Sequence, residues 1–137
     1  MTTSNSKTLA QLAVEKQPAP KGNSLRPCFA IAMDWLQGRS EVLQDAIGSR
    51  AEMGYQSYGV YLQPQNGRCA TTDIIQEALD KMTYLAQEWV EHNQLKSPYC
   101  DEILEDFWNE AQHVMRLYRR YQWKTNGGSD PGSEENT

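Results

Sequence analysis

The feature that most constrains the fold is a helical repeat of apolar residues in the middle of the chain. Between residues 72 and 92, apolar side chains recur at steps of three and four, at Ile75, Leu79, Met82, Ala86 and Trp89. This spacing places them on one face of an α-helix, so the stretch predicts an amphipathic helix that packs through a single seam. No window of the chain shows the sustained two-residue alternation of a β-strand. We therefore expect an all-α fold.

Start and stop signals divide the body of the chain, about residues 25–124, into a small bundle of about four helices. Ser40 is a good N-cap, and Pro98 after Ser97 is well suited to a first helical position. The expected segments are 28–37 before Gly38, 41–53 ending near Gly54, 72–92 capped by Thr71 or Thr72, and 98–123. A protomer this short leaves apolar seams uncovered, so we expect a homodimer or tetramer.

The two ends of the chain differ from the body in composition. Residues 1–24 are mostly polar and contain the linker-like run QPAPKGNS, with one short patch, LAQLAV, able to form a turn of helix. Residues 125–137 are acidic and of low complexity. Such segments bury too little apolar surface to order themselves, so we expect two disordered tails around an all-α domain at 25–124.

Composition also narrows the compartment and the partners. No apolar run approaches the roughly 20 residues of a membrane span, and the start does not resemble a secretory signal. Three widely spaced cysteines suit reduced thiols. We therefore expect a cytoplasmic protein, in the host cytoplasm if the protein is viral. A net charge of −5 argues against a nucleic-acid binder, whose surface would be basic.

Acidic residues form a stripe on each of two predicted helices, opposite the apolar seam. One stripe holds Asp73, Glu77 and Asp80 and continues to Tyr84, and the other holds Glu41, Asp45, Gly48 and Glu52. If the two stripes faced each other, their carboxylates would surround one space, an oxygen-rich cage suited to Mg²⁺ or Mn²⁺. The alternative is that both stripes are ordinary solvated faces.

The loop before residues 72–92 and two side chains within that helix offer candidate phosphate and base contacts. Arg68, after the Asn66-Gly67 turn, can donate a bidentate fork to a phosphate, or it can be a surface arginine beside a tight turn. Asn66 either reads a base edge or shapes the turn, and the turn is favoured. Lys81 either approaches a phosphate or pairs with Glu77, and pairing is favoured. Tyr84 either stacks on a base or packs.

The run YGVYLQPQNGR followed by QEALDKMTYL resembles the MazG-like, all-α nucleoside triphosphate pyrophosphohydrolases, and in particular small MazG-like proteins common in phages. The resemblance covers about residues 41–89, and Glu77 with Asp80 matches the ExxD motif of the family. In the family a second motif, EExxE, lies upstream, where this chain has Glu41 and Asp45.

This resemblance implies hydrolysis of a (deoxy)nucleoside triphosphate to the monophosphate and pyrophosphate. It implies that Mg²⁺ ions, held by carboxylates of two helices, clamp the polyphosphate and activate a water. Glu77 and Asp80 would then be both ligands and catalytic residues. A rival hypothesis from another class is a non-catalytic helical interaction module, such as a small phage protein that binds a protein partner through its apolar seams.

Overall fold

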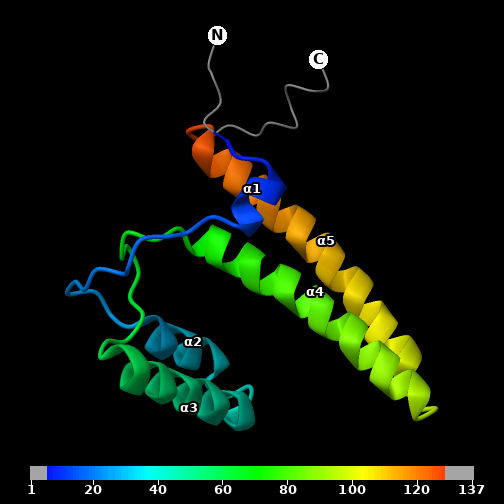
Figure 1. Cartoon of the computed structure of the whole chain (residues 1–137). Coiled ribbons are helices and arrows are strands. Elements are labelled where there is room, and N and C mark those ends of the chain that lie inside the picture. The colour runs from blue at the N-terminus through cyan, green and yellow to red at the C-terminus, as the bar shows by residue number, and fades with distance from the viewer. Residues whose placement is uncertain (1–5, 129–137) are drawn as a thin grey trace. The chain divides into compact units, whose positions relative to one another are not determined.

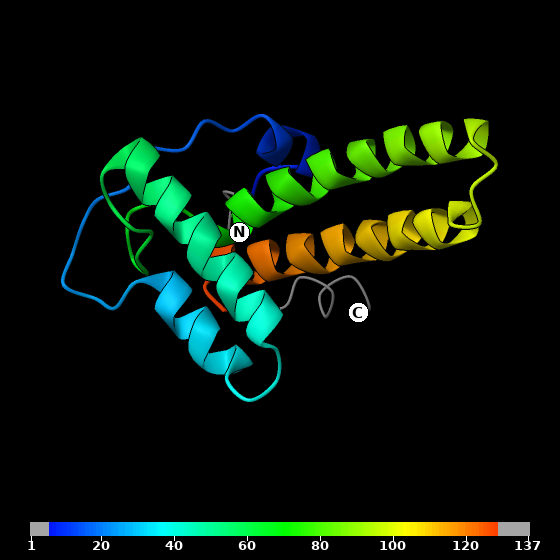
Figure 2. The same ribbon diagram turned by 90° about the horizontal axis from the view of Figure 1, so that it is seen from below.

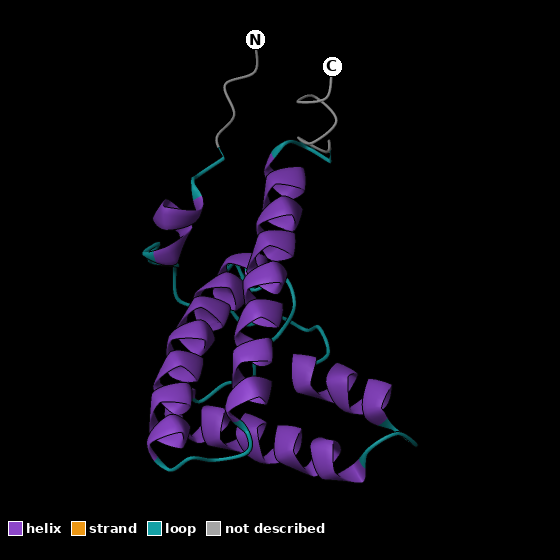
Figure 3. Ribbon diagram, turned by 90° about the vertical axis from the view of Figure 1, so that its right-hand side faces the viewer, coloured by secondary structure: helices purple, strands orange, loops and turns teal. Residues whose placement is uncertain are grey.

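A computed structural model describes residues 6–128, which contain helices and loops but no strand. The helices are α1 (Leu9–Ala13), α2 (Cys28–Leu36), α3 (Glu41–Tyr58), α4 (Ala70–Gln94) and α5 (Cys100–Thr125) (Figures 1 and 3). The all-α expectation is confirmed, with one helix more than the four expected. The described residues fall into two compact units, 6–16 with 69–128 and 17–68, and each is described by itself.

The first unit is built on a helical hairpin formed by α4 and α5, which lie side by side and run in opposite directions (Figure 2). The chain reverses over residues 95–99, where Lys96 has a φ of 54°. Ser97 Oγ accepts a hydrogen bond from the Tyr99 amide at 3.1 Å and lies 2.8 Å from His92 Nδ1. Residues 98 and 99 belong to this turn, and α5 begins at Cys100 and not at Pro98 as expected.

The N-cap of α4 also differs from the expectation. Cys69 occupies the cap position, and Thr71 and Thr72 lie inside the first turn. Thr72 is fully buried, so its side chain packs and does not cap the helix. The prediction of a threonine cap is therefore wrong, and the helix begins two to three residues earlier than the sequence indicated.

The core of the first unit joins three helices. Its buried members come from α1, α4 and α5, namely Leu12, Ile75, Ala78, Val114, Leu117 and Tyr121. Leu79 and Met82 are partly buried against this cluster. The predicted seam on α4 is confirmed for Ile75, Leu79 and Met82, but Ala86 is exposed and Trp89 is only half-buried. Buried Leu85 replaces them, because α5 meets α4 along a line slightly rotated from the predicted seam.

Helix α1 corrects the expectation of a disordered segment at residues 1–24. Thr8 Oγ1 accepts from the Gln11 amide at 3.2 Å, and Gln11 Oε1 accepts from the Thr8 amide at 2.8 Å, which is a capping box. Leu12 is fully buried in the core, and the Gln76 amide group donates to the carbonyls of Leu12 and Glu15 at 2.9 and 2.8 Å. Tertiary contacts order this short helix. Residues 1–5 and 129–137 of the predicted tails lie outside the described residues.

The second unit pairs α2 with α3. Ser40 caps α3 as predicted, with its Oγ accepting from the Leu43 amide at 3.1 Å. Helix α3 continues past Gly54 to Tyr58 and is capped by Gly59, whose φ of 75° is in the left-handed region that favours glycine. Gly48 faces Met33 of α2, so it belongs to the packing face of α3 and not to the acidic stripe.

Candidate functional site

Helix α4 presents Glu77 and Asp80 to solvent, one helical turn apart. Both side chains are exposed, whereas Asp73 is half-buried in the first turn of the helix. Lys81, which the sequence paired with Glu77, instead lies with its Nζ 2.9 Å from Oε2 of Glu110 on α5. The predicted Glu77–Lys81 pair is therefore wrong. Lys81 therefore joins α4 to α5 and forms no ion pair with Glu77.

Glu110 is the acidic centre of the α4–α5 hairpin. Its side chain is 11% exposed, and its Oε1 lies 3.0 Å from His113 Nδ1 while Lys81 contacts the other oxygen. Burial raises the pKa of the Glu110 carboxyl, but contacts with His113 and Lys81 outweigh burial and leave that pKa below its ordinary value of 4.5. The ionised form is thus the stable one in the folded protein.

Replacing Glu110 by glutamine removes the charge that contacts Lys81 and His113, and is expected to destabilise the protein near neutral pH. The expected loss is only about 1 kcal/mol, because solvent screens Lys81, whose side chain is 59% exposed. The pKa of Glu110 is lower in the folded protein than in the unfolded chain. Its charge therefore contributes to stability above the unfolded-state pKa, and this contribution is lost as the pH falls through the folded-state pKa. Urea unfolding at pH 7 and at about pH 3 checks this. The difference in free energy of unfolding between wild type and Glu110→Gln should be smaller at about pH 3 than at pH 7. An unchanged difference would contradict the stabilising role of the ionised Glu110. Glu102→Gln, at an exposed position, is the control.

Asp80 lines an open groove of about 520 Å³ where the end of α1 meets α4. Eight residues line it: Ala13, Val14, Glu15, Lys16, Gln76, Leu79, Asp80 and Thr83. Glu15 was not foreseen as a site residue, because its segment was assigned to a tail. The groove brings a second carboxylate, which pairs with Lys7, to the same depression as Asp80. The capping-box pattern at Thr8 and Gln11 was the sequence signal that could have revealed it.

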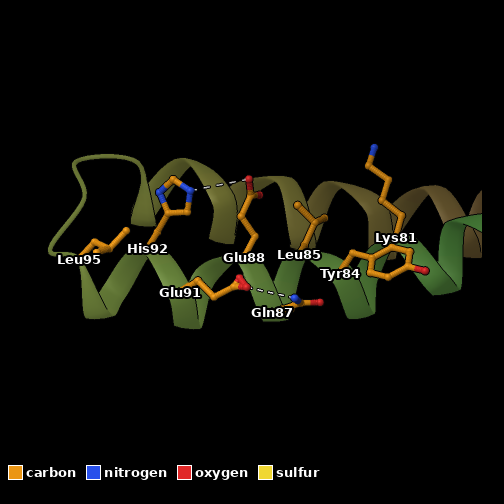
Figure 4. Close-up of a pocket in the computed structure, with 8 residues that line it drawn as sticks. All are labelled: Lys81, Tyr84, Leu85, Gln87, Glu88, Glu91, His92 and Leu95. Carbon is orange, nitrogen blue, oxygen red and sulfur yellow. Dashed lines mark hydrogen bonds and ion pairs between the residues drawn. The ribbon is translucent and has the colours of Figure 1, made fainter.

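Lys81 and Tyr84 line a different open groove, of about 550 Å³, along the same helix (Figure 4). Its other lining residues are Leu85, Gln87, Glu88, Glu91, His92 and Leu95. The polar side chains here pair among themselves, with Gln87 donating to Glu91 at 3.0 Å and His92 lying 4.0 Å from Glu88. The structure therefore does not gather Lys81 and Tyr84 with Asp80 in one pocket.

Asn66 and Arg68 hold a loop of the second unit together. Asn66 is 6% exposed; its Oδ1 accepts from the Arg68 amide at 3.0 Å and its carbonyl accepts from the Lys21 amide at 2.7 Å. Arg68 Nη1 donates to the carbonyl of Pro18 at 2.8 Å. The turn role favoured for Asn66 is confirmed, and at least one arm of the Arg68 fork contacts the protein backbone.

Two further polar residues, Gln63 and Asn23, complete this contact and were not foreseen. Gln63 Nε2 donates to the carbonyls of Asn23 and Leu25 at 2.6 and 2.8 Å, and its Oε1 accepts from the Asn23 amide at 3.0 Å. Asn23 Nδ2 donates in turn to the carbonyls of Pro64 and Gln65 at 2.8 and 3.3 Å. The linker-like run at 17–24 is thus bound to the loop at 60–68 by backbone-directed hydrogen bonds.

The acids predicted upstream lie in the other compact unit. Glu41 and Asp45 are exposed on α3, in the second unit, whereas Asp73, Glu77 and Asp80 belong to the first. The two sets of predicted ligands therefore belong to different units. Within residues 6–128, no group of three or more His, Cys, Asp or Glu side chains is arranged to hold a metal ion.

In comparisons with known proteins, no family model, no curated protein and no solved structure matched the chain. None of the helices in the described part is long and apolar enough to span a membrane.

Proposed function

We propose that this protein is a metal-dependent pyrophosphohydrolase, which converts a (deoxy)nucleoside triphosphate to its monophosphate and pyrophosphate. The observation that carries the proposal is the state of Glu77 and Asp80. Both are exposed on one face of a 25-residue helix, and no hydrogen bond or ion pair joins either to another residue between 6 and 128. Two uncompensated carboxylates one turn apart on a rigid element are suited to bind an external divalent cation.

In the proposed reaction the protein contributes mainly carboxylate ligands for the metal ions. Water attacks the α-phosphorus, the bond from that phosphorus to the bridging oxygen breaks, pyrophosphate leaves, and the proton of the attacking water passes to solvent. When bound, Mg²⁺ or Mn²⁺ would neutralise charge on the polyphosphate and lower the pKa of the attacking water. Hard oxygen donors such as Glu77 and Asp80 fit these ions. Asp73, Glu41 and Asp45 are proposed as further ligands.

The residues first considered for substrate binding have a smaller part in this proposal. Lys81 is paired with Glu110, and Asn66 and Arg68 hydrogen-bond within their own unit. Neutralisation of the phosphates is therefore assigned mainly to the metal ions. Tyr84, which is 67% exposed on α4, is proposed to stack on a base.

Metal binding itself gives a test that does not depend on the choice of nucleotide. Mg²⁺ or Mn²⁺ in excess should raise the melting temperature of the wild-type protein, because a ligand that binds only the folded state stabilises it. The double variant Glu77→Gln/Asp80→Asn should lose this shift. The matched variant Glu102→Gln/Asp106→Asn removes two exposed acids from α5 and should keep it. Equal shifts in both variants would contradict the proposed ligands.

A second candidate function, a non-catalytic helical interaction module, is favoured by exposed apolar side chains in the unit that contains α2 and α3. Trp35, Val42 and Tyr58 are 75%, 79% and 81% exposed, and neither helix contains a buried residue. Such surfaces are typical of protein contacts. The interaction-module hypothesis predicts no nucleotide hydrolysis with any divalent cation. The hydrolase hypothesis requires hydrolysis of at least one nucleotide.

A further inference from the structure

Helix α5 carries an apolar stripe outside its contact with α4. Leu104, Trp108 and Met115 are 45%, 61% and 53% exposed and follow helical steps, with half-buried Ala111 and Tyr118 completing the row. The buried face of the same helix, which includes Ile103, Val114 and Leu117, lies about a third of a turn away. Tyr118 also packs against the core, so the exposed part of this second apolar face is formed by Leu104, Trp108 and Met115.

The charges of α5 are separated along its length. Every acid precedes every base: Asp101, Glu102, Glu105, Asp106 and Glu110 are followed by Arg116, Arg119, Arg120 and Lys124. The helix dipole favours acids in the first turn and bases in the last, but its effect falls off within those turns. Glu105 and Arg116 lie well inside the 26-residue helix, so the separation exceeds what the dipole explains.

The charged residues nearest the stripe match those of a second α5 when the two helices run antiparallel, but not when they run parallel. Asp101 and Arg119 are separated by eighteen residues, about five full turns, so they lie on the same line of the helix, and Glu105 and Arg116 lie close to that line. Both pairs have their midpoint near Ala111, which is also the middle of the stripe. An antiparallel copy centred there sets each acid opposite a base, whereas a parallel copy sets acid against acid.

We propose that two copies of this chain associate through α5 in an antiparallel arrangement, with the stripe of Leu104, Trp108 and Met115 as the apolar centre and the acidic and basic ends as its flanks. Charge complementarity selects a second copy as the occupant and fixes its direction. This pairing does not depend on the proposed hydrolase activity, and either can fail alone.

Sedimentation equilibrium tests the assembly. Wild type should have the mass of a dimer, and Trp108→Lys should weaken association at least about 30-fold, since a central tryptophan is a typical hot spot. Circular dichroism should show the variant folded, because Trp108 is 61% exposed. Leu95→Lys, at a residue 79% exposed in the α4–α5 turn, is the control and should dimerise normally. A single-chain mass for wild type up to about 100 µM would overturn the proposal.

Charge reversal tests the orientation. Asp101→Lys/Glu105→Lys should weaken the dimer, because lysines then face the partner's arginines. Adding Arg116→Glu/Arg119→Glu in the same chain should restore it, since opposite charges meet again. A parallel dimer would respond to neither change in this way, so loss without restoration would contradict the antiparallel arrangement.

A distance measurement gives an independent check on the orientation. In Cys28→Ser/Cys69→Ser, a spin label on Cys100 reports the separation of the two helix starts by pulsed electron paramagnetic resonance. Serine is a good N-cap, so the change at residue 69 suits the start of α4. The antiparallel dimer predicts roughly 33 Å, twice the rise of the helix from Cys100 to Ala111. A separation near the interaxial distance of about 10 Å would overturn it.

Discussion

Replacing Glu77 by glutamine should lower the proposed rate of pyrophosphate release at least about 100-fold and leave the protein folded. Glutamine keeps the size and helix propensity of the side chain but removes the negative charge that a divalent cation requires. Glu77 is exposed on α4 and has no partner between residues 6 and 128, so the substitution breaks no contact of the fold. The substitution should therefore lower kcat and leave the melting temperature unchanged.

The measurement is steady-state pyrophosphate release in Mg²⁺ or Mn²⁺, with the melting temperature recorded for each variant. Glu102→Gln is the matched control, because Glu102 is also an exposed helix glutamate, on α5. Asp80→Asn should show the same loss as Glu77→Gln. A Glu77→Gln variant with wild-type turnover would remove the residue from the site, even if the protein proved to be a hydrolase.

Replacing Leu12 by alanine destabilises the unit of α1, α4 and α5 by about 2–4 kcal/mol, the usual cost of truncating a fully buried leucine. Leu12 is 0% exposed and packs in the cluster that contains Ile75 and Leu117. Helix α1 has five residues, far too few to be stable alone, so its order depends on this anchor. Loss of the anchor should free α1 as well as open a cavity.

Urea and thermal unfolding followed by circular dichroism check this, with a fall in melting temperature of about 10 °C expected. Val14→Ala is the control, because Val14 lies just past the same helix but is 82% exposed; it should change stability by less than about 0.5 kcal/mol. Equal and small effects of the two substitutions would show that α1 does not contribute to the core in solution.

The elements that the sequence predicted well are those whose signal is local and repeated. The three- and four-residue spacing of Ile75, Leu79 and Met82 extends along a helix long enough to dominate its own packing. Ser40 caps α3 through a bond to Leu43, three residues away. Neither feature needs information from a distant part of the chain.

The features that the sequence missed depend on distant partners. Helix α1 is too short for periodicity to reveal, and Leu12 becomes core only through Ile75 and Leu117. Lys81 has a local partner in Glu77, but a buried carboxylate needs a cation more than an exposed one does, so Lys81 pairs with Glu110. The hydrogen bonds between Asn23 and Gln63 join residues forty positions apart.

The candidate site also combines features that local sequence predicts with features that depend on distant residues. Exposure of Glu77 and Asp80 opposite the seam follows from helical spacing alone, and the structure agrees with it. The groove that adds Glu15 beside Asp80 depends on the packing of α1 and has no local signature beyond the capping box. The assignment of Glu41 and Asp45 as ligands stays a prediction from the sequence.

The proposed activity is cleavage of nucleoside triphosphates with the help of a divalent cation. It is tested by measuring pyrophosphate release by the purified protein from a panel of ribo- and deoxyribonucleoside triphosphates, with Mg²⁺, with Mn²⁺ and with a chelator. Stoichiometric monophosphate and pyrophosphate should form from at least one nucleotide, and the chelator should abolish their formation. Absence of pyrophosphate from every nucleotide with either metal would contradict the proposed activity.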